Sequence, residues 1–133
     1  MNVEHLIGKV KRWAAGRVDI VGVALVGSHA RGVARPDSDV DLVLLCADPE
    51  LLTDTNWISE FGQVRSFELE DYGALQSVRV HYQDAVEVEF GIADRSWARI
   101  PLDPGTRKVL VGGVRILYDP ELLLRAAIDA TGA

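Results

Sequence analysis

The chain has 133 residues, enough for one hydrophobic core but too few for two independently folded lobes, so we expect one domain spanning residues 1–133. Hydrophobic residues make up 48% and charged residues 26% of the chain, close to the averages of globular proteins, which argues against a disordered chain and against a membrane protein. The net charge of -6 disfavours nucleic acid as a partner, because such binding depends largely on Lys and Arg side chains that neutralise phosphates.

The expected location is the cytoplasm. Charged residues interrupt the N-terminal segment, and no apolar run approaches the roughly 20 residues that a membrane span needs. Cys46 is the only cysteine, which excludes a disulfide within these residues and a zinc site built from cysteines. Its place at the end of an apolar run predicts an inert, buried thiol.

The first two predicted elements are a helix and a buried strand. Apolar residues recur at helical spacing over residues 3–14, with basic residues on the other faces, which predicts an amphipathic helix that ends near Gly16. The run from Val18 to Ser28 is apolar and rich in valine, as expected of a strand that is covered on both faces and ends at Gly27.

A short helix and a second strand follow. Ser28 is predicted to cap a helix through the letters HARG, before Pro36 interrupts the chain. The letters DVDLVLLC, which begin at Asp39, then predict a strand that ends at Cys46. The two strands on either side of the short helix flank the candidate site.

The middle of the chain is predicted to hold a short helical segment followed by three strands. Asp48 and Pro49 open a loop or short helix, and residues 53–62 combine capping residues with apolar residues at helical spacing, which predicts a helix. Three later segments are rich in β-branched residues or alternate between apolar and polar residues, which predicts strands over residues 64–71, 77–82 and 85–92. The last two of these strands should pair as a hairpin.

The C-terminal third is punctuated by proline and glycine. The letters PLDPGT are predicted to break the chain, VGGVRILYDP to hold a short strand, and Pro120 to begin a short last helix. Taken together, these elements predict an α/β or α+β domain in which a mixed β-sheet has helices packed against it.

Gly27 and Ser28 form the first half of a candidate binding site. A turn between a buried strand and a helix start presents backbone N–H groups that favour anions, and here it adds the Ser28 hydroxyl. Gly32 would let the short helix turn without a side chain near the ligand, or serve only as its C-cap. The glycine pattern alone is weak evidence for a phosphate site.

Asp39 and Asp41 form the second half. Residues two apart on a strand lie on one face, so both carboxylates should project together, opposite Val40 and Leu42. Two carboxylates this close repel unless a cation lies between them, and hard oxygen ligands suit Mg²⁺ that bridges phosphates. Alternatively, the aspartates only begin a strand, while Asp37 or Ser38 satisfies turn amides.

The combination of both halves resembles a known family. GSHARG followed by SDVD is similar to the GSxxxG…[ST]DxD signature of the DNA polymerase beta nucleotidyltransferase superfamily, particularly its minimal bacterial members, and the resemblance extends from about Val18 to Ile92. It implies a nucleotidyltransferase fold, an NTP substrate held at Gly27 and Ser28, and two Mg²⁺ ions held by Asp39, Asp41 and a third carboxylate on a neighbouring strand.

Two glutamates compete for the role of third carboxylate. Glu87 and Glu89 share one face of the predicted strand over residues 85–92. Glu89 is preferred because it stands between Val88 and Phe90, in the hydrophobic-acidic-hydrophobic pattern of the family, and Glu87 is the alternative. The resemblance then implies in-line attack on the α-phosphate, with pyrophosphate as the leaving group and AMP, from ATP, transferred to a hydroxyl.

The acceptor is not encoded in these motifs. Relatives of this size include antitoxins that adenylylate a partner toxin, and antibiotic-modifying enzymes with an added helical domain, so the resemblance implies that a protein partner or a homodimer completes the acceptor site. A non-catalytic NTP-binding or partner-binding module is the alternative. A template or tRNA-end polymerase is disfavoured by the acidic charge.

Several further residues attract attention but decide less. Arg31 is a candidate for binding a phosphate as a forked donor, or it pairs with Asp37 or another local acid. His29 lies within the glycine turn, and a catalytic role for it is not favoured. The remaining candidates are interpreted as solvated or structural: His5, His81, Arg107, Lys108, Trp13, Trp57 and Trp97.

Overall fold

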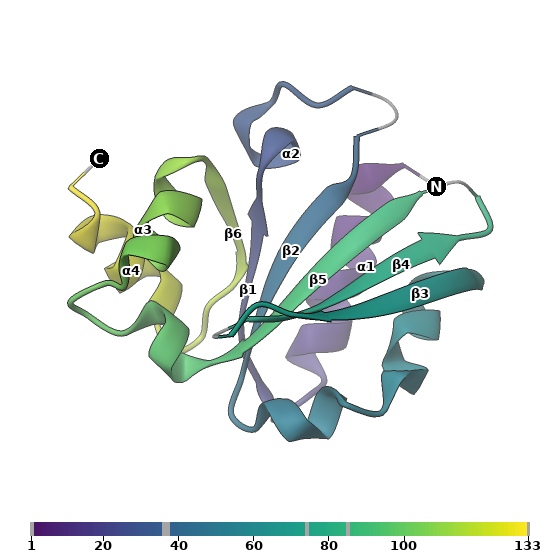
Figure 1. Ribbon diagram of the computed structural model, residues 1–133, viewed down its shortest axis with the longest axis horizontal. Helices are drawn as coiled ribbons and strands as arrows, with labels where there is room; N and C mark the ends of the chain where they lie inside the picture. The colour runs from purple at the N-terminus through teal and green to yellow at the C-terminus, as the bar shows by residue number, and fades with distance from the viewer. Residues whose placement is uncertain (1, 36–37, 74, 85, 133) are drawn as a thin grey trace.

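The computed structural model describes residues 2–35, 38–73, 75–84 and 86–132, and these form a mixed six-stranded sheet with helices on both faces (Figure 1). The strand order is β3-β4-β5-β2-β1-β6. Strands β2 and β5 pair in parallel, whereas the other neighbours are antiparallel. The strands are β1 (Ile20–Val26), β2 (Val40–Cys46), β3 (Val64–Asp71), β4 (Gln76–Tyr82), β5 (Glu87–Asp94) and β6 (Val114–Tyr118).

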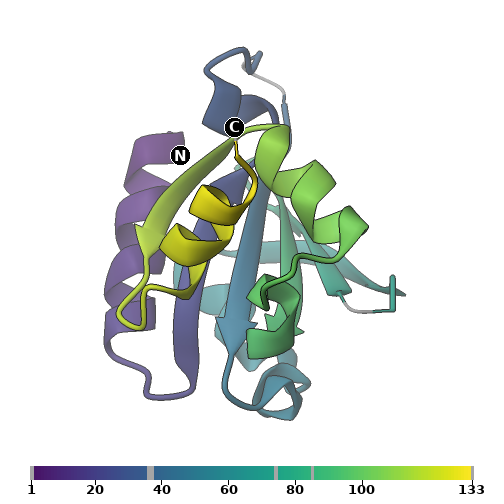
Figure 2. The ribbon, with the colours of Figure 1, turned by 90° about the vertical axis from the view of Figure 1, so that its left-hand side faces the viewer.

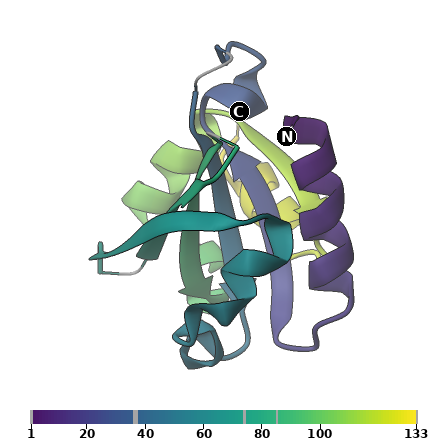
Figure 3. The same ribbon diagram turned by 90° about the vertical axis from the view of Figure 1, so that its right-hand side faces the viewer.

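The helical elements divide between the two faces of the sheet. One face packs against α1 and η2 (Figure 3), and the other against η3, α3 and α4 (Figure 2). The α-helices are α1 (Val3–Ala15), α2 (Ser28–Arg31), α3 (Pro104–Val111) and α4 (Leu123–Ala130), and the 3₁₀ helices are η1 (Pro49–Leu52), η2 (Thr55–Phe61) and η3 (Arg95–Ala98). The expected α+β architecture is therefore confirmed. None of the helices in the described ranges has the length and apolar character that crossing a membrane requires.

The two central strands are buried on both sides, as their sequences predict. Every residue of β1 is buried, and its side chains alternate between two core clusters, with Val23 in one and Ala24 in the other. In β2, Leu42 and Leu44 belong to the cluster under α1, whereas Val43 belongs to the cluster under α3 and α4. The predicted period of two is thus confirmed, and it puts Asp41 on the α3 side of the sheet.

Capping residues define the ends of the first helix, and aromatic side chains pack beneath it. The Asn2 side chain accepts a hydrogen bond from the His5 amide, and α1 ends at Gly16 as expected. Trp13 stacks on Trp57 with ring centroids 5.5 Å apart, and Phe61 lies edge-on to Trp13. The interpretation of Trp13 and Trp57 as core anchors agrees with this packing.

Two predicted helix starts are wrong. Ser28 is the first residue of α2 rather than its cap; Gly27 holds the cap position, and no side-chain cap bond is formed there within the described residues. The last helix begins at Leu123, after Pro120, because the Asp119 carboxylate accepts hydrogen bonds from the amides of Leu124 and Arg125.

The segment around PLDPGT is a helix start rather than a simple break. Asp103 accepts a hydrogen bond from the Gly105 amide at 2.9 Å, and Pro104 occupies the first helical position of α3, where a missing N–H costs nothing. The predicted helix over residues 53–62 is instead the 3₁₀ helix η2, which begins after the cap Asp54.

The topology gathers several chain segments at one end of the sheet. Because β2 and β5 are parallel neighbours, their first residues lie side by side. The antiparallel strand β1 ends there as well, with Val26 opposite Asp41, and α2 follows it directly (Figure 1). The glycine turn and the acidic starts of β2 and β5 therefore meet.

Candidate active site

Gly27 lies against Asp41. The backbone at Gly27 has φ of 76°, and a Cβ added there would come within 2.7 Å of the Asp41 Oδ2 atom. A side chain is therefore excluded both by the left-handed conformation and by the neighbouring carboxylate. Gly32 has φ of 74° and open space around its Cβ position, so its need for glycine comes from its role as the α2 C-cap.

The side chains that follow Gly27 have different roles. Ser28 lies at the first turn of α2. His29 Nε2 lies 3.1 Å from the Ser38 carbonyl oxygen, which ties α2 to the segment that leads into β2. The Arg31 guanidinium donates a 2.7 Å hydrogen bond to the Gly112 carbonyl oxygen, so in this structure it ties α2 to the end of α3. Its other expected partner, Asp37, lies outside the described residues.

The register between β2 and β5 brings the predicted carboxylates together. Asp41 is paired directly with Glu89, and Val40 with Val88. Asp39 immediately precedes β2, and Glu87 is the first residue of β5. The four acidic side chains are partly buried, whereas Val40 and Val88 are fully buried. Of the two candidate glutamates, Glu89 is the one beside Asp41, while Glu87 shares the Arg79 Nη1 atom with Asp39.

Arg79 is the residue that sequence reasoning missed. Its Nη1 atom lies 3.0 Å from Asp39 Oδ2 and 3.5 Å from Glu87 Oε2, and its Nη2 atom lies 2.7 Å from Glu89 Oε2. The antiparallel pairing of β4 with β5 places Arg79 opposite Glu89. The alternation in SVRVHY assigns Arg79 to the polar face of its strand, but only the register shows which acids it meets.

His81 and Ser77 extend the same polar face. His81 Nδ1 lies 3.0 Å from Glu87 Oε1, and its Nε2 lies 3.2 Å from Glu68 Oε1 on β3. The Ser77 hydroxyl donates a 3.0 Å hydrogen bond to Glu89 Oε1. His81, which the sequence alone leaves as a solvated or structural residue, is therefore linked to two carboxylates by the pairing of the strands.

The electrostatics of the carboxylates are unequal. Burial and the charges of Glu89 and Asp39 raise the pKa of Asp41 to about 6. A hydrogen bond with the Asp39 carboxyl, together with burial, raises the pKa of Glu87 above its ordinary value. Burial lowers the pKa of Arg79, but the nearby carboxylates outweigh that effect and raise it overall, so the guanidinium stays charged.

The donor set fits a hard divalent cation. Carboxylates of Asp39, Asp41, Glu87 and Glu89 converge at the starts of β2 and β5, and oxygen is the ligand that Mg²⁺ prefers. The raised pKa of Asp41 marks negative charge that a cation would relieve. Among the described residues, no three acidic, histidine or cysteine side chains are already arranged as a ready cation site.

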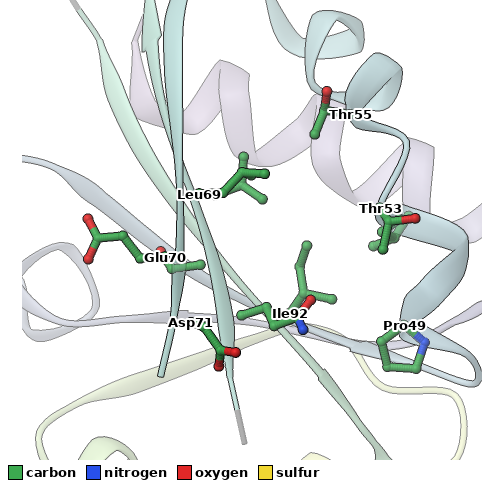
Figure 4. A pocket seen from close by; sticks show the side chains of 11 residues that line it. Pro49, Thr53, Thr55, Leu69, Glu70, Asp71 and Ile92 are labelled. Carbon is green, nitrogen blue, oxygen red and sulfur yellow. The ribbon is translucent and has the colours of Figure 1, made fainter. Parts of the chain in front are cut away.

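Two cavities are lined by none of the four carboxylate residues, although Ser77, which donates a hydrogen bond to Glu89, lines the first of them. A cavity of about 280 Å³ lies between η1 and the strands β3, β4 and β5, with Leu69, Thr53 and Ile92 among its lining residues (Figure 4). A second cavity, of about 430 Å³, lies between the β3–β4 hairpin and the start of α3. Neither lining includes a residue predicted to bind nucleotide or metal.

Comparison with known proteins agrees with this arrangement. The nucleotidyltransferase domain profile matches residues 6–96, which include the glycine turn, both aspartates and both glutamates. The chain belongs to the nucleotidyltransferase domain family. No curated protein matches the chain significantly in sequence.

Two solved structures are similar to the chain. An aminoglycoside 6-adenyltransferase from Bacillus subtilis superposes with a TM-score of 0.59 at 15% identity, covering 74% of this chain and 37% of that protein. The nucleotidyltransferase chain thus spans little more than a third of that enzyme's length. A toxin-antitoxin structure with AMP-PNP aligns over 94% of this chain and 82% of the other, at 13% identity and a TM-score of 0.47.

Proposed function

We propose that the protein is a Mg²⁺-dependent nucleotidyltransferase that transfers AMP from ATP to a hydroxyl of a protein or small-molecule acceptor and releases pyrophosphate. The observation that carries this proposal is the position of Asp41. It touches the Gly27 turn on one side and is paired with Glu89 on the other, so an anion-binding turn and a set of cation ligands share one place.

Each residue has a role in this mechanism. The backbone amides after Gly27 and the Ser28 hydroxyl bind the β- and γ-phosphates. Asp39, Asp41 and Glu89 would hold Mg²⁺, with Glu87 as the alternative third ligand. Magnesium, when bound there, neutralises the phosphates and promotes ionisation of the acceptor hydroxyl. The chain itself aligns the α-phosphate with that hydroxyl, so its contribution is positioning and charge.

The acceptor site is completed, in this proposal, by a protein partner or a second copy of the chain. Support comes from the edge strand β3, which exposes Phe67 and Leu69, with Leu69 65% exposed. An apolar pair of this kind on an edge strand is typical of a surface that a protein covers.

The second candidate function is a non-catalytic module that binds NTP or a partner. One observation favours it: Arg79 forms ion pairs with Asp39 and Glu89, as it would in a purely structural ion-pair network. The two functions differ in whether bound ATP is cleaved at the α-phosphate.

The deciding experiment uses ATP labelled at the α-phosphate. The protein is purified together with the proteins that bind it and incubated with labelled ATP and Mg²⁺, and label transfer and pyrophosphate release are followed. The proposal expects a labelled acceptor, and expects Asp41→Asn to abolish both signals. Pyrophosphate release at the normal rate by Asp41→Asn would refute the mechanism, and ATP binding without turnover would favour the non-catalytic module.

A further inference from the structure

Arg79 connects three segments of the candidate site. Its two terminal nitrogens reach Asp39, ahead of β2, and Glu87 and Glu89, on β5. The side chain is 27% exposed, so these contacts lie in a partly desolvated place where an ion pair is stronger than at an open surface. Arg79 belongs to β4, which places no carboxylate of its own there, so its role differs from that of the predicted ligands.

Repulsion among the carboxylates at the starts of β2 and β5 is the reason to expect a cation there. The starts of β2 and β5 bring Asp39, Asp41, Glu87 and Glu89 into one cluster, and like charges at short range oppose folding. Within the described part of the chain, the ion pairs of Arg79 include all of these acids except Asp41. Asp41 has no direct ion pair with Arg79, and the charge of Arg79 lowers its pKa only in part.

We propose that Arg79 is a resident counter-ion: it holds Asp39 and Glu89 together in the metal-free protein and competes with divalent cations for their oxygens. This inference rests on the proposed function, since it takes these carboxylates to be cation ligands. Arg79 is a positioning residue in this scheme, because it acts on the ligand side chains rather than on reacting atoms.

The hydrogen bonds of Arg79 identify the oxygen atoms for which it would compete with a cation. Asp39 Oδ2 and Glu89 Oε2 both accept hydrogen bonds from the guanidinium, and Glu89 Oε1 accepts one from Ser77. A cation that binds these oxygens must therefore weaken or displace the guanidinium. The phosphates of an incoming nucleotide offer Arg79 another anion, so cation and nucleotide should bind more tightly together than separately.

A different role for Arg79 makes the opposite prediction. If the guanidinium only orients Asp39 and Glu89 in a geometry ready for metal, its removal lets the carboxylates separate and weakens cation binding. If it competes, its removal strengthens cation binding, although the metal-free protein becomes less stable. Cation affinity in the absence of nucleotide therefore separates the two roles.

The experiment measures Mn²⁺ binding to the nucleotide-free protein by calorimetry and by the paramagnetic resonance of free Mn²⁺. Wild type is compared with Arg79→Gln and with the control Arg95→Gln, which also removes one arginine from a paired carboxylate, that of Glu121, outside the site. We expect Arg79→Gln to bind Mn²⁺ about tenfold more tightly and Arg95→Gln to match wild type. The metal-free melting temperature of Arg79→Gln should fall, and saturating Mn²⁺ should raise it by more than in wild type.

Equal or weaker Mn²⁺ binding by Arg79→Gln overturns the counter-ion role while leaving the metal site in place. Absence of Mn²⁺ binding to both proteins instead refutes the proposed function. If Arg79→Gln does not fold, Arg79→Lys supplies the test, because it keeps the charge but cannot span both acids in a fork. Its Mn²⁺ affinity should exceed that of wild type by about threefold, and an unchanged or lower affinity contradicts competition.

Discussion

Replacing Asp41 with asparagine should stabilise the metal-free protein and abolish nucleotidyl transfer. The asparagine side chain has the same shape as aspartate but no charge, so the substitution removes electrostatic repulsion without opening a cavity. Burial and the charges of Glu89 and Asp39 raise the pKa of Asp41 from 3.8 to about 6, which means that the folded protein disfavours the ionised form.

The expected gain follows from this pKa difference. A shift of about 2 pKa units corresponds to roughly 3 kcal/mol of stability lost when the carboxyl is ionised. Solvent screening of a partly exposed carboxylate reduces this figure, so we expect Asp41→Asn to gain about 1 to 3 kcal/mol at pH 7.5. For a domain of this size, that gain raises the melting temperature by roughly 3 to 10 °C.

The pKa difference also determines the direction in which the stability advantage of Asp41→Asn changes with pH. At a pH well below 3.8, Asp41 is protonated in both the folded and the unfolded protein, so the variant has no electrostatic advantage. As the pH rises from the unfolded pKa of 3.8 to the folded pKa of about 6, the unfolded chain releases its proton first, and wild type loses stability. The advantage of Asp41→Asn should therefore appear over this interval and stay constant above it.

Urea unfolding at a series of pH values, with a chelator present, measures this difference. Asp39→Asn is the matched control, because Asp39 forms an ion pair with Arg79 and its neutralisation should give no stabilisation at pH 7.5. Added Mg²⁺ should stabilise wild type and have little effect on Asp41→Asn. A variant that is less stable than wild type at pH 7.5, or an advantage that does not change with pH, refutes the reasoning.

Further substitutions test the other parts of the site. Gly27→Ala should lower the free energy of unfolding, measured with urea, by about 1 to 3 kcal/mol and should weaken ATP binding. The reason is that the alanine Cβ would collide with the Asp41 carboxylate and that the backbone at Gly27 has a positive φ. Ser28→Ala should leave stability within about 0.5 kcal/mol and weaken binding of a fluorescent ATP analogue by roughly three- to tenfold; unchanged binding contradicts phosphate contact. Glu89→Gln should lower kcat at least about a hundredfold and Glu87→Gln less than about tenfold, and equal losses contradict the choice between them.

The parts of the fold that follow from local rules were predictable from the sequence. The apolar run from Val18 and the alternation after Asp39 predicted β1 and β2, and the glycine turn between them predicted α2. These signals are strong because strand periodicity and glycine conformation act over a few residues. By contrast, the sequence predicts a break at the start of α3, because Asp103 and Pro104 are typical both of a turn and of a helix start.

The parts that depend on strand pairing could not be predicted. Nothing local to Arg79 indicates that it faces Asp39, from which it is separated by 40 residues in the chain. The hairpin of β4 and β5 was expected, but a shift of its register by one residue would turn Arg79 to the other face. For the same reason, Glu87 and Glu89 were nearly equivalent in sequence, and it is the parallel register that puts Glu89 beside Asp41.

The burial and mutual repulsion of carboxylates thus oppose folding at the place where the proposed chemistry occurs. Because Gly27 has no side chain, Asp41 can approach the turn that is proposed to bind the phosphates, and it lies where its ionised form is unfavourable. Arg79 forms ion pairs with the other acids, and at Asp41 its charge offsets only part of the effect of burial and of the neighbouring carboxylates. The charge that remains on Asp41 would favour a bound cation, so ligand binding and folding stability are coupled through this carboxylate.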